Sequence, residues 1–196
     1  MPVRAIEASL LSGSELYREV ILDKLSHARE SVLIATANLK DMHIERGGSF
    51  ASVLALFSEL AGRGVELRIL HAELPSRPFR ASFEKRRRLT RGGLTLKICP
   101  RVHFKAVLVD HAWVYVGSAN FTGAGLGAKS EGKRNFELGL CTEDFETVDR
   151  VQALFESVWT GVECATCRLR SVCPDPIGEP VRRSLVRLGH ARRLGA

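Results

Sequence analysis

The sequence has no apolar run that approaches the roughly 20 residues of a membrane-spanning helix. Its first residues, 1–7, are interrupted by charge and do not form the apolar core of a secretory signal. We therefore expect a cytoplasmic protein without a transmembrane segment. The glycine-rich stretch at 123–127 lacks the Lys and Ser or Thr that end a nucleotide-binding phosphate loop. No internal repeat is visible either, which excludes a duplicated domain.

Cysteine is scarce, with five residues in the chain, and cytoplasmic thiols stay reduced, which argues against disulfides. Three of the five, Cys164, Cys167 and Cys173, are close enough in sequence to suggest soft-metal ligation. Their spacing resembles the end of the iron–sulfur loops of some DNA glycosylases and nucleases, where a fourth cysteine completes the site. The fourth ligand here would be Cys141 or Cys99, both of which are otherwise explained as small buried residues.

The group held by this tail would be a [4Fe–4S] cluster or a zinc ion. His190 is a further candidate for the fourth ligand and would suit zinc. The alternative is a thiol-rich tail that binds no metal. Neither group is needed for the chemistry considered below.

The formal net charge of +7 is concentrated in two segments. Residues 77–91 carry a net charge of +6 and residues 168–196 carry +5, so the rest of the chain is acidic overall. Such patches favour a polyanion, most simply nucleic acid, because binding releases counterions. A solvated loop or a contact with anionic lipid is the other interpretation. The residues that we expect to bind nucleic acid are Arg77, Arg80, Lys85, Arg86, Arg87 and Arg88.

The length suits one domain with a substantial core, here residues 1–160, followed by a basic, cysteine-containing tail at 161–196. Strands are expected at 32–35, where an apolar run indicates burial on both faces, and at 65–70 and 94–98. A helix between the first two strands favours a crossover within one sheet. Apolar spacing predicts the helices at 14–29, 50–60 and 143–159, and loops at 41–48 and 73–91.

The most informative stretch is residues 101–140. Over residues 102–109 two sets of positions alternate with the period of a strand: Val102, Phe104, Ala106 and Leu108 on one face, and His103, Lys105, Val107 and Val109 on the other. His103 and Lys105 lie two residues apart and would therefore point to the same face of that strand. An imidazole beside an ammonium group makes a poor core face but a good anion site, because the ammonium can neutralise phosphate oxygens.

Asp110 begins a plausible turn, and residues 113–116 read as a second strand that returns antiparallel. This hairpin would bring Gly117, Ser118 and Asn120 back toward His103. Glycine permits a close backbone approach, while serine and asparagine supply small hydrogen-bond donors. The hairpin therefore predicts a compact phosphate-binding group.

Together these positions read His-x-Lys-x4-Asp-x6-Gly-Ser-x-Asn. The pattern resembles the HKD signature of the phospholipase D superfamily, and all six fixed positions match at the right spacing. Asn135 and Glu137 extend the resemblance, because superfamily members carry an Asn-x-Glu at this distance. The resemblance is to single-motif members of the bacterial endonuclease type. It implies an α/β architecture in which helices flank a mixed β-sheet, the phospholipase D-like fold.

The resemblance also implies a mechanism that requires no metal. His103 would attack a phosphodiester phosphorus, and water would later hydrolyse the phosphohistidine. Lys105, Ser118 and Asn120 would hold the non-bridging oxygens and stabilise charge in the transition state. Glu137 would accept a hydrogen bond from the other imidazole nitrogen of the nucleophile and so set its tautomer.

Asp110 is the remaining residue of this candidate catalytic set, in which it would orient the hairpin rather than touch substrate. The mechanism also needs a second histidine, to protonate the leaving oxygen and then activate water. Because the chain has one motif, the resemblance implies a twofold homodimer that pairs two copies of His103 in one active site. His71 or His111 acting within one chain is the less favoured substitute.

Three functions remain open. A phosphodiesterase that cleaves DNA or RNA is favoured by the short single-motif chain and its basic patches. A phospholipid hydrolase or phosphatidyl transferase would need an apolar membrane-facing element, and none is evident. A nucleic-acid-binding module with an inactive site is disfavoured by the complete motif.

Overall fold

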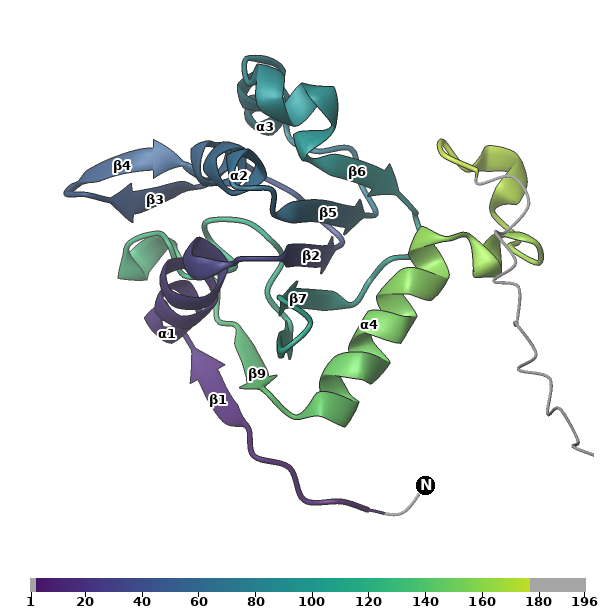
Figure 1. The fold of residues 1–196 in the computed structure, drawn as a ribbon, viewed down its shortest axis with the longest axis horizontal. Coiled ribbons are helices and arrows are strands. Elements are labelled where there is room, and N and C mark those ends of the chain that lie inside the picture. Colours follow the sequence, from purple (N-terminus) through teal and green to yellow (C-terminus); the bar gives the residue numbers. More distant parts are fainter. Residues whose placement is uncertain (1–2, 177–196) are drawn as a thin grey trace, which may run out of the picture.

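A seven-stranded mixed sheet organises the computed structural model, which describes residues 3–176 (Figure 1). The strand order is β1-β9-β8-β7-β2-β5-β6, with β2, β5 and β6 parallel and the other neighbours antiparallel. This arrangement confirms the expected α/β fold with a mixed sheet. The strands are β1 (Ser9–Ser12), β2 (Ser31–Thr36), β5 (Glu66–His71), β6 (Thr95–Ile98), β7 (Lys105–Val109), β8 (Trp113–Gly117) and β9 (Leu138–Thr142).

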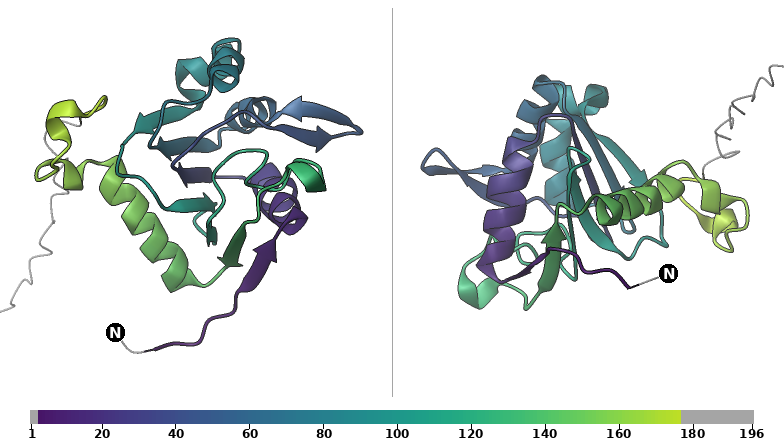
Figure 2. Two further views of the ribbon diagram at one scale, coloured as in Figure 1. Left: turned by 180° about the vertical axis from the view of Figure 1, so that it is seen from behind. Right: turned by 60° about the horizontal axis from the view of Figure 1, so that its bottom comes forward.

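One face of the sheet is covered by an N-terminal helical segment and by α2 (Figure 2). The larger core lies between these helices and the sheet, and β2 is buried along its whole length, as its apolar run predicts. The Ser52 hydroxyl caps α2 by accepting the backbone N–H of Leu54 at 3.1 Å. The segments on this face are α1 (Ser14–Leu16), which continues into η1 (Tyr17–Lys24) and η2 (Leu25–His27), and α2 (Val53–Gly62).

The opposite face is covered by α4 (Phe145–Trp159), close to the predicted helix at 143–159. Asp144 caps this helix by accepting the backbone N–H of Thr147 at 2.9 Å. Its C-terminal part is fixed to β5, because two nitrogens of Arg68 donate to the Glu156 carboxylate at 3.1 and 2.7 Å. The helix therefore packs over β7 and β8, is tied to β5 near its C-terminal end, and leaves part of the β8, β9 and β1 surface exposed on this face.

Two expected loops contain secondary structure. Residues 41–48 do not form a loop: a two-stranded hairpin of β3 (His43–Arg46) and β4 (Ser49–Ser52) projects from the domain (Figure 1). Phe50 lies in this hairpin and is 70% exposed, so the prediction that it belongs to the helical core face was wrong. Tight turning at Gly47 and Gly48, both at positive φ, makes the hairpin possible.

The basic stretch at 73–91 was also expected to be a loop, and it is largely helical. It forms α3 (Arg77–Glu84) and the start of η3 (Leu89–Gly93). Ser76 caps α3, and Pro78 occupies its first turn, where a missing N–H costs nothing. Phe79 is fully buried and stacks on Phe83, so the aromatic residues hold the segment on the core.

The chain after α4 turns through η5 (Val162–Cys164) and η6 (Arg170–Val172); one more short helical turn, η4 (Glu131–Lys133), precedes β9. Residues 177–196 lie outside the described part, including His190 and most of the second basic segment, namely Arg182, Arg183, Arg187, Arg192 and Arg193. Within residues 3–176, no helix has the length and apolar character to span a bilayer.

Candidate active site

The sheet register brings the motif to one end of the sheet. Lys105 pairs with Gly117, and Gly117 pairs with Gly139 on β9. On the other side of β7, Ala106 pairs with Ala35, which places Thr36 beside Lys105. The start of β7, the end of β8 and the start of β9 therefore meet in one row, with the end of β2 next to them.

His103 precedes β7 rather than belonging to it, because the strand begins at Lys105. The predicted strand over residues 102–109 is therefore too long by three residues. The Lys105 ammonium donates to the His103 carbonyl at 2.7 Å and lies 3.4 Å from His103 Nδ1. The imidazole is exposed, so an incoming phosphate could reach the histidine and the lysine together.

Asn120 is held by the end of β2. Its Oδ1 accepts the backbone N–H groups of Ala37 and Asn38, each at 3.1 Å, and the Thr36 hydroxyl lies 3.2 Å away. Because backbone N–H groups can only donate, the amide atom that they contact must be the oxygen, and the other amide atom is the Nδ2 nitrogen. The arrangement fixes the amide oxygen of Asn120 and leaves its Nδ2 group as the donor of the side chain.

Ser118 and Glu137 form a second pair at the same end. The Ser118 hydroxyl donates to the Glu137 carboxylate in a very short hydrogen bond, and Asn135 donates to the other carboxylate oxygen at 3.1 Å. The sequence predicts that Glu137 accepts from His103. In the single chain described here Glu137 instead binds Ser118 and Asn135, while the contacts of the His103 ring are with Lys105.

Gly117 is required by close packing at this point. A Cβ on Gly117 would lie 2.6 Å from the Leu138 carbonyl oxygen and would also collide with the Tyr115 hydroxyl. Tyr115 is buried beneath the glycine, and this burial raises its phenol pKa to about 12. The Tyr115 phenol therefore packs below the site in its neutral form and does not supply an acid or base at neutral pH.

The structure does not bring Asp110 to this group, because it lies at the opposite end of the β7–β8 hairpin. Asp110 and His111 both have φ of 55° in the tight turn. The Asp110 carboxylate accepts the backbone N–H groups of Arg29, Glu30 and Ser31 at 2.7 to 3.0 Å. It ties the turn to the start of β2, which is an orienting role.

Neither candidate for a second histidine within the chain fits that role. His111 shares the far turn with Asp110 and contacts Ser31 and Gln152. His71 is buried at the end of β5, where desolvation lowers its pKa and its Nδ1 lies 2.9 Å from the Glu73 carbonyl oxygen. His71 is therefore a buried structural histidine whose Nδ1 has the Glu73 carbonyl as its hydrogen-bond partner.

One participant that the motif did not reveal is Thr36. Its hydroxyl contacts Asn120 and the Asn38 carbonyl, and it accepts the backbone N–H of Phe121 at 2.9 Å. In the sequence, Thr36 is recognisable as the polar residue that ends an apolar strand, which is a position where open sheets hold ligand groups. Thr36 supports Asn120 from below rather than facing substrate, because it is fully buried.

The six basic residues expected to bind nucleic acid lie along α3 and the turn after it. Three of them are partly used inside the chain. Arg80 donates to the Pro75 carbonyl, Arg86 to Ser82 and Arg88 to the Ser58 carbonyl. The side chains of Arg77, Lys85 and Arg87 are exposed.

The five cysteines separate into two groups. Cys141 is buried in the larger core on β9. The other four line one pocket beside the end of β6, namely Cys99, Cys164, Cys167 and Cys173. Among residues 3–176, no group of three or more histidine, cysteine or acidic side chains is arranged so that it could hold a metal ion.

Comparisons with known proteins agree with this geometry. Residues 21–159 match the protein family described as cardiolipin synthase, PLD-like domain. NucT from Helicobacter pylori is similar in structure, with a TM-score of 0.56 and 18% identity over 77% of this chain and 94% of that chain. Nuc from Salmonella typhimurium, a phospholipase D family member, has the same TM-score and identity over 78% and 95% of the two chains.

A further similar structure is an archaeal chromatin protein with a novel mode of DNA binding, with a TM-score of 0.54 and 15% identity over 81% of this chain and 54% of that one. No curated protein sequence matches the chain. These structural similarities concern the fold, whereas the family match covers well over half of the sequence, from the N-terminal helical segment to the end of α4. The chain therefore belongs to the phospholipase D superfamily of phosphodiesterases.

Proposed function

We propose that the protein is a nuclease of this superfamily that cleaves DNA or RNA through a phosphohistidine, without a metal ion in the reaction. The observation that carries the proposal is the meeting of His103, Lys105, Ser118 and Asn120 at one end of the sheet. A nucleophile, a cation and two small donors are what a phosphodiester requires.

In the proposed first step an imidazole nitrogen of His103 attacks phosphorus, and the bond to the leaving ester oxygen breaks. A second histidine gives its proton to that oxygen. In the next step the same second histidine takes a proton from water, which attacks phosphorus and breaks the phosphorus–nitrogen bond. The products are a phosphate monoester and an alcohol. Lys105 and Asn120 hold the non-bridging oxygens throughout.

The second histidine is proposed to be His103 of another copy of the chain in a twofold dimer. The exposed apolar surface beside the site supports this assembly. On the face that α4 leaves uncovered, Leu140 pairs with Val116 on one side and with Leu10 on the other. Leu10, Leu138 and Leu140 are all well exposed, and Phe136 next to Glu137 is fully so. Exposed apolar surface of this kind is typical of an interface with another chain, and a twofold axis would bring equivalent residues of the two copies together.

Cleavage assays test the proposed function directly. We expect the purified protein to cleave labelled single- or double-stranded DNA, or RNA, and to do so equally well with EDTA in the assay. A model diester, bis(p-nitrophenyl) phosphate, tests the chemistry without a binding requirement, and phosphatidylcholine tests the lipid alternative. Cleavage of phosphatidylcholine alone would assign the site to lipid, and no cleavage of any diester would reject the enzyme.

Nucleic acid as the substrate is supported by the basic surface of α3. We expect the triple variant Arg77→Gln/Lys85→Gln/Arg87→Gln to bind DNA or RNA more weakly, because three exposed cations no longer displace counterions. The slope of log affinity against log salt should fall by about 2 to 3 for duplex DNA. Fluorescence anisotropy at several salt concentrations measures the slope. Where the nucleic acid would be cleaved during the measurement, both proteins also carry His103→Ala.

The matched control removes three exposed arginines elsewhere, as Arg18→Gln/Arg29→Gln/Arg150→Gln. It lowers the net charge by the same amount but leaves α3 intact. An equal loss of slope in both triple variants would mean that overall charge, and not the α3 surface, carries the binding. An unchanged slope in the α3 variant would remove this surface from the interface.

A further inference from the structure

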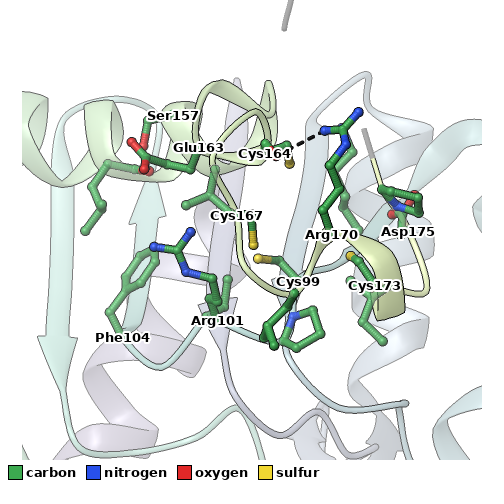
Figure 3. Close-up of a pocket in the computed structure, with 18 residues that line it drawn as sticks. Cys99, Arg101, Phe104, Ser157, Glu163, Cys164, Cys167, Arg170, Cys173 and Asp175 are labelled. Carbon is green, nitrogen blue, oxygen red and sulfur yellow. Dashed lines mark hydrogen bonds between the residues drawn. The ribbon is translucent and has the colours of Figure 1, made fainter. Parts of the chain in front are cut away.

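Four of the five cysteines line a single cavity of about 290 Å³ although they come from segments far apart in the sequence. Cys99 directly follows β6, and the other three lie in the turns after α4. Figure 3 shows the side chains of Cys99 and Cys167 pointing toward each other, with Cys164 above them and Cys173 to their right. The sequence alone could not choose between Cys99 and Cys141 as a partner for the tail, and only Cys99 lies here.

The backbone of both segments is set so that the thiols stay on the pocket side. Successive backbone bonds join Cys164 N–H to the Gly161 carbonyl, Cys167 to Cys164 and Arg170 to Cys167, at 2.9 to 3.3 Å. One turn therefore separates Cys164 from Cys167, the local geometry of a Cys-x2-Cys metal knuckle. Cys99 is fixed independently, because its N–H donates to the His71 carbonyl at 2.8 Å.

Two arginines face the same pocket. Arg101 and Arg170 both line it, and Arg170 donates to the Cys164 carbonyl at 3.1 Å. A zinc ion or a [4Fe–4S] core with two positive charges leaves two negative charges when four thiolates bind it. Two guanidinium groups at the rim would balance that charge in a partly enclosed site.

We propose that Cys99, Cys164, Cys167 and Cys173 bind a thiolate-ligated metal centre, with a [4Fe–4S] cluster as the expected form. The four sulfurs are gathered but not yet grouped for a metal, so ligation requires side-chain rotation. Rotation between staggered rotamers moves a cysteine sulfur by about 3 Å without moving the backbone. The pocket of about 290 Å³ leaves room for a cluster as well as for a single ion.

The centre would act on the active site through the chain that connects them. Only residues 100–102 separate Cys99 from His103, and the Val102 N–H donates to the Cys99 carbonyl at 2.9 Å. A metal that joins Cys99 to the segment after α4 would fix the end of residues 100–102 that lies away from His103. The metal would therefore help to position the nucleophile, without touching substrate and without taking part in the chemical steps proposed above.

The test is the metal content of the full chain purified without oxygen. We expect about four iron and four sulfide per chain and an absorption band near 400 nm, as iron–sulfur proteins have. Cys99→Ser should lose most of the iron, whereas Cys141→Ser, which changes the buried cysteine outside the pocket, should keep it. One zinc per chain, lost only in Cys99→Ser, would support the four-thiolate site with the single ion as its occupant.

The proposal fails on any of three results. One is the absence of stoichiometric metal, both as purified and after reduced protein is incubated with iron and sulfide or with Zn²⁺. Another is equal loss of metal in Cys99→Ser and Cys141→Ser. The third is a disulfide from Cys99 to a tail cysteine in protein handled anaerobically. Metal content is independent of cleavage, so this outcome is distinguishable from failure of the nuclease assignment.

Discussion

Replacing His103 with alanine is expected to abolish cleavage, with a loss of roughly 10⁴-fold or more in turnover, as for removal of other nucleophiles that form covalent intermediates. The reason is specific to the site. His103 is the exposed imidazole next to the Lys105 ammonium, while the buried ring of His71 is engaged by its own strand end. Initial rates on a chromogenic diester and on labelled nucleic acid, both with EDTA, measure the effect.

The matched control is His111→Ala, a histidine of the same hairpin at its other end. We expect that variant to keep most of the activity, with any loss traceable to lower stability, since its ring contacts Ser31 and Gln152. Quenching the wild type during turnover with a denaturant at alkaline pH, where a phosphohistidine is stable, should trap the phosphoryl group of the substrate on His103. Undiminished cleavage by His103→Ala would refute the phosphohistidine mechanism, and equal loss in both variants would point to a folding defect.

The sequence predicted the parts of the fold that follow from local pattern. The apolar runs of β2, β7 and β8 were sufficient, because each strand buries a nearly continuous set of side chains. The fixed spacing of the motif predicted the meeting of its residues. The turn predicted at Asp110 also places Asp110 and Asn120 at opposite ends of one hairpin, and the contacts of the two side chains agree with this.

The parts that escaped prediction depend on contacts distant in sequence. Phe50 fits a helical pattern with α2, yet it belongs to β4, because pairing with β3 holds the backbone extended there. The arginines around Phe79 suggested a solvated loop, although Ser76 and Pro78 were available as helix-start signals. Cys99 could not be assigned to the tail because β6 and the turns after α4 meet only in the folded chain.

Replacing Leu140 with glutamate is expected to separate the proposed dimer and to remove most of the cleavage activity. Leu140 is 44% exposed at the centre of the apolar row on β8, β9 and β1, so a charge there costs the single chain little. It would be costly in an interface, where the carboxylate would be desolvated against its own copy. Without the partner the general acid is missing, which corresponds to a loss of about 10²- to 10⁴-fold.

The control is Phe50→Glu, which places the same charge on an apolar side chain that is 70% exposed on the β3–β4 hairpin. Light scattering after size exclusion should give a monomer for Leu140→Glu and a dimer for Phe50→Glu and the wild type.

A second measurement does not depend on folding of a new variant. When wild type exchanges subunits with an equal amount of His103→Ala, a shared site leaves about half of the activity per wild-type chain, because every mixed dimer is inactive. Unchanged activity per wild-type chain, or a fully active Leu140→Glu monomer, would mean that one chain carries a complete site. The acid would then have to come from a group other than a second His103.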